Sequence, residues 1–509
     1  MNKKEFIKIT SPNQFEIRAG YLANTQKKKI DYSINIYLFI PTNLSINSST
    51  YTNEDFYNDH ISYIRLITPK YELGILKNRL KGLVMALKNN MDNDEEKSIL
   101  KHEVKLVVCS YISYLKSYSR SLTKKGIKPK RIRVLLKRIK EFDTIKKELL
   151  ALNINQDDKK LVHLVESTAE YLSLTTQNHL FKINIYLKSF GNQYNEIINE
   201  IVKLINEEIK FCKKNNFPII SLNEYENEKV IFRYSVFKKY FYSVLYLYQK
   251  RKEDGVSIKE FYYALAAGIS MIFTTAVVFA TQQEYGNFTT SFFAALVISY
   301  MFKDRLKEAY RHYFDKKIAL KTYDYKEKIY DADKKSLFAF IRERVRFIDK
   351  ENLDDKVVEA RLKGVPSRLS TWFLGEDIIK YEKNISLYNK NIQSYYNNTV
   401  NGIHNIMRFD ISKFLKKMDE PKVPLYRSNG TSLYGSKVYH VNIIVEFKSD
   451  EEVSYHKARL ILDKNGIKRV ELPEFDIKLF PQTNQKKEKN WFKLKKSGLL
   501  RKIIKEKDA

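Results

Sequence analysis

Two uncharged stretches lie close together near the middle of the chain: FYYALAAGISMIFTTAVVFATQQ at residues 261–283 and YGNFTTSFFAALVISYMF at residues 285–302. As helices they would span roughly 34 and 27 Å, close to a hydrocarbon core of about 30 Å. We therefore expect a two-helix transmembrane hairpin, with helices at about 261–281 and 286–302. The alternative is a buried helical hairpin in a soluble protein.

Basic residues flank this hairpin on both sides. The preceding ones are Lys250, Arg251, Lys252 and Lys259, and the following ones are Lys303, Arg305, Lys307, Arg311, Lys316 and Lys317. The connecting residues 282–287 contain no Lys or Arg. Because cytoplasmic loops carry an excess of these residues, we expect a multi-pass protein of the cell's inner (plasma) membrane with both termini in the cytoplasm. The opening MNKKEFIKITSP lacks the apolar segment of a signal peptide.

Small residues recur at helix-contact spacing within the hairpin. Ala264 and Gly268 lie four residues apart, as do Ser291, Ala295 and Ser299. Small side chains let helix backbones approach closely in a membrane. We expect these stripes to pack the two helices against each other, and homo-oligomerisation is the alternative use.

The loop between the two stretches reads Glu284, Tyr285, Gly286, Asn287, Phe288. It resembles the Tyr-Gly-Met-Asn-Phe loop of the bacterial magnesium-channel family, which also places a large cytosolic domain before a two-helix hairpin. The Met of that family's Gly-Met-Asn motif is missing here, and the long segment 303–509 follows the second stretch. The resemblance implies an oligomeric two-helix ion channel as an alternative function.

Length and composition limit the classes of protein. A chain of 509 residues is too long for one ordinary core, so we expect two or more domains. The net charge is +31, from 91 Lys and Arg against 60 Asp and Glu. The two cysteines, Cys109 and Cys212, exclude a disulfide scaffold and a thiolate-built metal site. We expect both to be buried as small hydrophobic side chains.

Strand patterns occur near both ends of the chain. Every second residue of 30–40 is apolar, the period of a strand with one apolar face: Ile30, Tyr32, Ile34, Ile36, Leu38 and Ile40. Residues 439–447 alternate in the same way, a further strand is expected at 453–462, and Asn465-Gly466 suits a hairpin turn. Whether the terminal strands share one sheet stays open from the sequence.

Between these strands the pattern is helical. Thr52 with Asp55 resembles a helix start, and residues 72–250 have helical periodicity. We expect an α+β membrane protein with a helical cytosolic region, a two-helix transmembrane hairpin and a β-rich cytosolic C-terminal domain. Its segments are a β-rich N-terminal cytosolic segment (1–75), a helical cytosolic domain (76–258), the transmembrane hairpin (261–302), a helix plus β-rich cytosolic domain (303–481) and a basic amphipathic tail (482–509).

Motifs for catalysis or metal binding are missing from the sequence. It has no phosphate-binding loop, no dinucleotide fingerprint, no zinc-protease motif and no nucleophile elbow. The nearest approach to a metal pair is His440 with His456 on adjoining strands. We expect His440 opposite Leu460 and His456 opposite Ile444, which separates the rings by about 13 Å, too far for shared ligation. No catalytic, cofactor-binding or metal-binding residue is predicted, and we lean against an enzyme.

Two basic clusters are candidate contacts for a membrane surface or another polyanion. Their members are Lys124, Lys125, Lys130, Arg131 and Arg133, and in the tail Trp491, Phe492, Lys493, Lys495 and Lys496. Anionic lipid headgroups attract such segments by about 1 kcal/mol per basic residue. Nucleic acid is the competing partner, and a solvated surface is the plainest interpretation.

Together these observations favour a membrane-anchored cytosolic scaffold, sensor or assembly protein. The expected partners are the lipid bilayer with its anionic headgroups and an unidentified protein, with nucleic acid and a second copy of the chain as further candidates. No cofactor is expected. The alternatives are the oligomeric channel and a membrane-bound enzyme with an unrecognised site.

Overall fold

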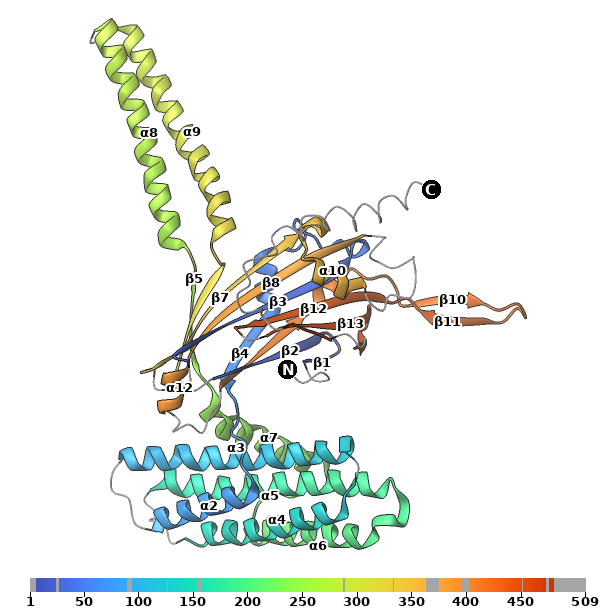
Figure 1. The fold of residues 1–509 in the computed structure, drawn as a ribbon. Coiled ribbons are helices and arrows are strands. Elements are labelled where there is room, and N and C mark those ends of the chain that lie inside the picture. The colour runs from blue at the N-terminus through green and yellow to red at the C-terminus, as the bar shows by residue number, and fades with distance from the viewer. Residues whose placement is uncertain are drawn as a thin grey trace, which may run out of the picture.

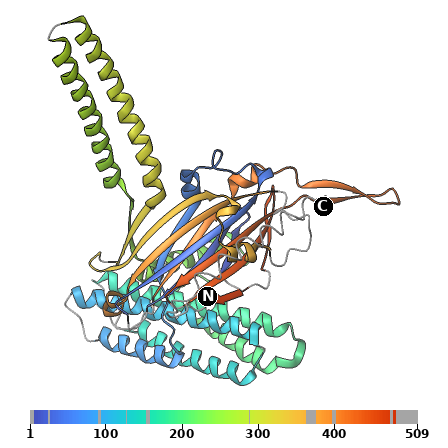
Figure 2. The same cartoon turned by 45° about the horizontal axis from the view of Figure 1, so that its top comes forward.

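The computed structural model describes residues 6–23, 27–88, 94–125, 127–152, 158–286, 289–332, 334–362, 375–395, 402–450, 452–472 and 476–479. Helices and strands are mixed, as the predicted α+β class requires. Two β-sheets form the centre of the molecule, a helical bundle lies on one side of them, and a long helical hairpin projects on the other side (Figure 1). Figure 2 shows the same arrangement with the hairpin clear of the sheets and the bundle.

The larger sheet has nine strands, and all of its pairings are antiparallel. Its order is β14 (Gly466–Glu471), β13 (Val453–Asp463), β12 (Tyr439–Ser449), β3 (Lys29–Pro41), β8 (Glu376–Tyr388), β7 (Leu337–Ile348), β6 (Tyr325–Tyr330) and β5 (Tyr248–Glu253), with β15 (Asp476–Leu479) also paired to β13. The N-terminal strand β3 therefore lies between two strands from the C-terminal half of the chain.

The smaller sheet has the same mixed origin. Its order is β1 (Ile7–Ser11), β2 (Gln14–Leu22), β9 (Gly402–Asp410) and β4 (His60–Leu66). It lies between the larger sheet and the bundle (Figure 1), and side chains from both sheets form one core. Ile17, Ile36, Ile379 and Met407 of this core are fully buried. The terminal strands therefore do share sheets, which the sequence left open, and residues of 1–75 and of 303–481 fold as one body.

Strand β3 confirms the alternation expected at residues 30–40. Ile34, Ile36, Leu38 and Ile40 point into the core between the sheets. The other face of the strand is also covered near its end, because Phe39 packs beneath the short helix α10 (Asp355–Leu362). A strand buried on both faces is apolar on both.

Helix α1 (Asn53–Asp59) begins where the sequence indicated. The side chain of Thr52 accepts a hydrogen bond from the Asp55 backbone, and the Asp55 side chain accepts one from the Thr52 backbone. Further short elements lie between the longer helices and strands: η1 (Thr42–Leu44), η2 (Gly191–Tyr194), η3 (Ser243–Leu245), η4 (Lys350–Asn352), α12 (Asn389–Tyr395), α13 (Ser412–Leu415) and the separate hairpin of β10 (Lys422–Tyr426) with β11 (Ser432–Ser436).

The helical bundle occupies the region predicted to be helical. Its members are α2 (Leu73–Lys88), α3 (Asp94–Lys125), α4 (Pro129–Leu150), α5 (Lys159–Lys188), α6 (Asn195–Lys214) and α7 (Glu224–Tyr242). Cys109 and Cys212 are both buried in it, as expected. Burial raises the pKa of the Cys109 thiol to about 12, so the thiol is unreactive at neutral pH.

The projecting hairpin consists of α8 (Val256–Tyr285) and α9 (Thr290–Lys321), both longer than the predicted helices. It extends directly from the paired edge strands β5 and β6. The predicted contact through Ala264 and Gly268 is wrong, because both residues are exposed and the buried positions on α8 are Ala266, Ser270 and Thr274. A shift of two residues turns a helix by about 200°, which moves the stripe to the opposite face.

On α9 the outcome of this prediction is mixed. Ser299 is buried at the contact and Ala295 is half-buried, whereas Ser291 is exposed. The Thr274 hydroxyl lies 3.5 Å from the Ser299 carbonyl oxygen across the pair.

Candidate functional site

A row of charged side chains crosses four strands on the inner face of the larger sheet. Arg251 on β5 pairs in register with Glu327 on β6, and Glu343 on β7 pairs with Lys383 on β8. Apart from Arg251, these side chains are at most 5% exposed. Lys383 and the two carboxylates thus lie in the core, and Arg251 stands at the solvent-exposed end of the row. We call these four residues the charge ladder.

Hydrogen bonds connect the charge ladder to the smaller sheet. Lys383 Nζ lies 3.8 Å from Glu343 Oε1 and donates to Ser62 Oγ at 2.8 Å. Ser62 in turn donates to Asn405 Oδ1 at 2.9 Å. Glu343 accepts a hydrogen bond from the Tyr381 hydroxyl at 2.5 Å. Strands β4, β8 and β9 are therefore linked through polar groups as well as through apolar packing.

The two carboxyl groups of the ladder titrate in opposite directions. Burial raises the pKa of Glu327, and the neighbouring Glu343 charge raises it further. The charges of Lys383 and Arg251 lower this pKa but do not offset the rise, so the pKa of Glu327 is about 7. Burial acts on Glu343 in the same way, but Lys383, His60 and the Tyr381 hydroxyl outweigh it and hold the pKa of Glu343 well below its ordinary value. Near neutral pH Glu343 is ionised and Glu327 exchanges a proton.

His60 closes the site from the smaller sheet. Its ring packs on Phe56, Tyr381 and Phe409 at centroid distances of 5.6, 4.9 and 4.8 Å. Burial lowers the pKa of His60 to about 3, so the ring is neutral at physiological pH. The buried Nε2 atom has no hydrogen-bond partner within the part of the chain that the structure describes.

The chemistry available here is proton binding rather than metal binding. Among the described residues no group of three His, Cys, Asp or Glu side chains is placed to hold a metal ion. Two adjacent carboxyl groups with separated pKa values are the usual requirement for acid–base work. In this site, however, both face the interior between two sheets.

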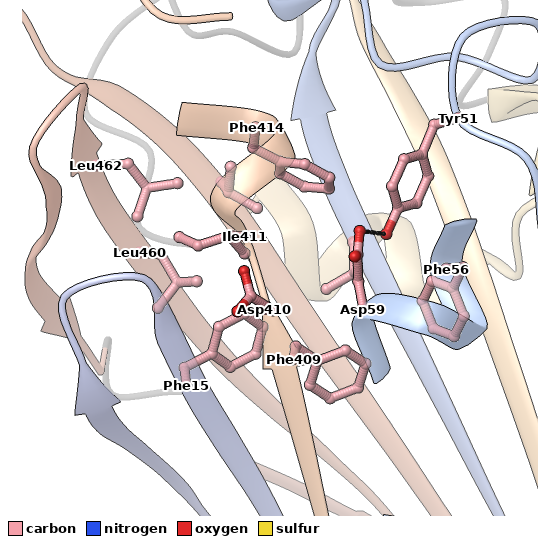
Figure 3. Close-up of a pocket in the computed structure, with 12 residues that line it drawn as sticks. Phe15, Tyr51, Phe56, Asp59, Phe409, Asp410, Ile411, Phe414, Leu460 and Leu462 are labelled. Carbon is pink, nitrogen blue, oxygen red and sulfur yellow. Dashed lines mark hydrogen bonds between the residues drawn. The ribbon is translucent and has the colours of Figure 1, made fainter. Parts of the chain in front are cut away.

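A small pocket lies further along the same interior (Figure 3). Phe15, Phe409 and Leu460 line it, and the Tyr51 hydroxyl donates to Asp59 at its edge at 3.0 Å. Burial raises the pKa of Asp59. The cavity measures about 20 Å³, room for about one water molecule and too little for an organic substrate.

The outer face of the larger sheet is basic along β5–β8, away from the part that α10 covers. Like charges face each other across neighbouring strands in the register pairs Lys250–Lys328, Lys252–Lys326, Lys326–Arg342 and Arg346–Lys380. Such pairs destabilise a sheet. Within the described chain, Lys250, Lys252 and Lys328 have no ion-pair partner. We call the cations of β5–β8 on this side the basic sheet face.

A shallow groove adjoins this face. It is open to solvent, has a volume of about 430 Å³, and is lined by Lys29, Asp31, Arg342, Lys448 and Asp450, among others. Lys29 pairs with Asp31 at 3.1 Å. Because two carboxylates offset most of the charge of the three cations in its lining, the groove lacks the strong positive charge of the basic sheet face.

The predicted basic clusters fall elsewhere. Lys130, Arg131 and Arg133 are exposed on α4, in the bundle, on the far side of the sheets from the hairpin (Figure 1). Arg133 pairs with Glu196 at 2.8 Å. Lys124 and Lys125 end α3, but their side chains lie outside the described part of the structure. The tail residues Trp491, Phe492, Lys493, Lys495 and Lys496 lie outside the described residues.

The histidine pair is separated, as expected, although the register differs by one residue. His440 faces Ile461 and His456 faces Val445, where the sequence predicted Leu460 and Ile444. The backbone N–H of Ser449 donates to the Glu452 carbonyl, a register one residue away from that of a turn centred at Asp450. The next turn also lies one residue early: Asp463 pairs with Gly466, so Lys464 and Asn465 form the loop.

Sequence reasoning missed the charge ladder, although a signal for it existed. Lys383 interrupts a run of inward-facing positions that includes Ile379, Tyr381 and Ile385, and Glu343 stands between Ile341 and Val345 in the same way. Charged residues at the apolar phase of a strand indicate a buried pair. The sequence could not show that the two charges lie on neighbouring strands in register.

No known protein-family model, curated protein sequence or solved structure matches this chain.

Replacing Lys383 with Met should lower the free energy of unfolding by about 3–5 kcal/mol, because Glu343 loses its buried cation. Adding Glu343→Gln should recover part of this loss, since a neutral amide needs no counter-charge. Lys380→Met, on the outer side of the same strand, should change stability by about 1 kcal/mol or less. Urea unfolding in detergent measures all three, and equal losses for Lys383→Met and Lys380→Met would contradict the ladder's role.

Glu327→Gln should change how stability depends on pH. The folded-state pKa of about 7 lies above the ordinary 4.5, so proton binding stabilises the fold fully below pH 4.5 and the effect is lost as pH rises through 7. Relative to the variant, wild type should lose up to about 1.4 kcal/mol per pH unit across this window. Unfolding curves of both proteins from pH 4 to 8 measure the difference in their free energies of unfolding. The histidines are the same in both proteins, so their contributions cancel in this difference. Curves of wild type and variant that stay parallel across this range would refute a raised Glu327 pKa.

Proposed function

We propose that this chain is a membrane-anchored scaffold or assembly protein, in which α8 and α9 enter the bilayer and the sheets with the bundle form a cytosolic body. The main observation in support is that α8 and α9 pack on each other and leave most of their apolar side chains exposed. Phe261, Ile272, Phe279 and Phe293 are each at least 65% exposed. Uncovered apolar surface of this extent marks contact with a membrane or a protein partner.

Helix α8 supports the membrane as that contact. Within the described residues it alone is long and apolar enough to cross a bilayer, and only 17% of its most apolar window is buried. A core helix of a soluble protein would be mostly buried. The proposal thus rests on exposure as well as on composition.

The body supports a binding role more than a catalytic one. The enclosed pocket holds about one water molecule, and the charge ladder faces the interior. The basic sheet face is instead accessible, and it lies on the side of the sheets from which the hairpin projects (Figure 1). Its unpaired lysines suit an anionic partner.

Removal of the hairpin should release the protein from membranes. The backbones of Asp254 and Asp324 are hydrogen-bonded at 3.1 Å, so a short Gly-Ser linker can replace residues 257–321 without opening the sheet. The full chain should stay in the membrane pellet after a carbonate wash and the deletion variant should be soluble and folded. The matched control replaces residues 422–436, whose flanking residues Pro421 and Lys437 also lie close together, and should remain in the pellet. Release of the full chain by carbonate would refute the anchor.

Charge reversal should locate the surface that binds anions. The triple variant Lys250→Glu, Lys252→Glu, Lys328→Glu should bind heparin about a hundredfold more weakly at low salt, since each lysine contributes about 1 kcal/mol. The control reverses Lys130, Arg131 and Arg133 on α4 and should change the affinity less. A larger loss in the control would assign anion binding to α4 instead.

A further inference from the structure

The contacts between α8 and α9 fix which residues lie at the same level of the hairpin. Thr274 meets Ser299, and near the base the Tyr263 hydroxyl donates to Asp315 at 2.6 Å. The Arg311 guanidinium lies 5.1 Å from the centre of the Tyr263 ring. The α9 segment 303–311 therefore lies beside the α8 segment 263–271.

These two segments differ sharply in polarity. The uncharged part of α8, residues 261–283, is about 34 Å long and matches a bilayer core, whereas the uncharged part of α9, residues 290–302, is about 20 Å long. When α8 spans the core, the α9 segment KDRLKEAYR at 303–311 lies within it. Both apolar stretches are free of charge in the sequence. Only the packing of the two helices shows that a charged segment of α9 lies at the level of the apolar part of α8.

The charges of α9 follow a regular stripe. Asp304, Lys307, Glu308 and Arg311 occupy positions i, i+3, i+4 and i+7, which share one helix face. The side chain of Glu308 is 72% exposed. Charged residues at membrane depth face the interior of a bundle or a water-filled space rather than lipid.

We propose that copies of the chain assemble through α9, with its charged stripe turned toward a shared, water-accessible axis and α8 turned toward lipid. This inference rests on the proposed membrane anchoring. The stripe is self-complementary, because the carboxylates of Asp304 and Glu308 in one copy can face Lys307 of the next. Arg311 lies over the Tyr263 ring of its own α8 and borders the stripe. On α8, Phe261, Leu265 and Ile272 lie on the face opposite the contact with α9 and are 66%, 42% and 71% exposed, as a lipid-facing surface requires.

The wet part of this axis ends at Phe302. Beyond it α9 exposes Phe293, Leu296, Val297 and Ile298, which are apolar. The assembly therefore has a polar vestibule on the side of the body and an apolar closure near the tip.

Single cysteines test the arrangement, because Cys109 and Cys212 are buried and contribute little background. Glu308→Cys on α9 and Gly268→Cys on α8 lie at nearly the same level, and a side chain at 268 meets no atom within 4 Å. In membranes containing the full chain, Glu308→Cys should form a disulfide-linked dimer on oxidation and react with an aqueous maleimide. Gly268→Cys should give at least about tenfold less of both products, since lipid excludes water and thiolate.

Other outcomes overturn the inference in distinguishable ways. Labelling at both positions without cross-linking, in protein that resists carbonate extraction, would place the charged half of α9 outside the bilayer while the anchor stands. Cross-linking mainly through Gly268→Cys would assign the interface to α8. Absence of both products at Glu308→Cys would also reject the assembly. Release of the protein by carbonate would refute the anchor itself.

A charge-reversal pair tests complementarity without cysteines. Asp304→Lys with Glu308→Lys makes the stripe wholly cationic and should weaken self-association in detergent at least about tenfold by analytical ultracentrifugation. The matched control, Glu253→Lys with Glu260→Lys at exposed positions near the base of the hairpin, should leave the assembly intact. Equal behaviour of the two variants would reject the stripe as the contact.

Discussion

The pairing of β3 on both sides is the constraint on which the rest of the molecule depends. Its residues 29–41 pair with β8 along the whole strand and with β12 along much of it. A buried strand needs both neighbours to satisfy its backbone hydrogen bonds. The sheets therefore cannot close until the C-terminal part of the chain has returned, and the bundle and the hairpin are insertions between strands of one body.

The charges on the two faces of strands β5–β8 are arranged differently, because the two faces differ in their access to solvent. On the inner face Arg251 and Lys383 are balanced by Glu327 and Glu343, because an unpaired charge in the core costs several kcal/mol. On the outer face water screens the repulsion between lysines, so the chain can keep an excess of positive charge. That excess weakens the sheet locally, and it is the charge on which the proposed anion binding rests.

The hairpin inherits its position from the edge of the same sheet. Strand β5 leads into α8 and β6 follows α9, so any movement of the hairpin acts first on the pair that carries Arg251 and Glu327. This pair is the exposed end of the charge ladder. The ladder and the hairpin are thus adjacent in the structure, joined through β5 and β6.

The sequence by itself determined the local elements of this protein. The period of two at residues 30–40, the cap at Thr52 and the helical region 72–250 follow from neighbouring residues, and so do the buried cysteines. Tertiary structure alone decided that the N-terminal strand lies among C-terminal ones, that Glu343 meets Lys383, and that Ala266 rather than Ala264 meets α9. Each of these depends on register between segments distant in sequence, and a shift of one or two residues reverses which face a side chain occupies. For the same reason the sequence predicted that the apolar stretch 285–302 crosses the membrane. Only the packing of α9 against α8 shows that the charged segment 303–311 lies beside the uncharged segment 263–271.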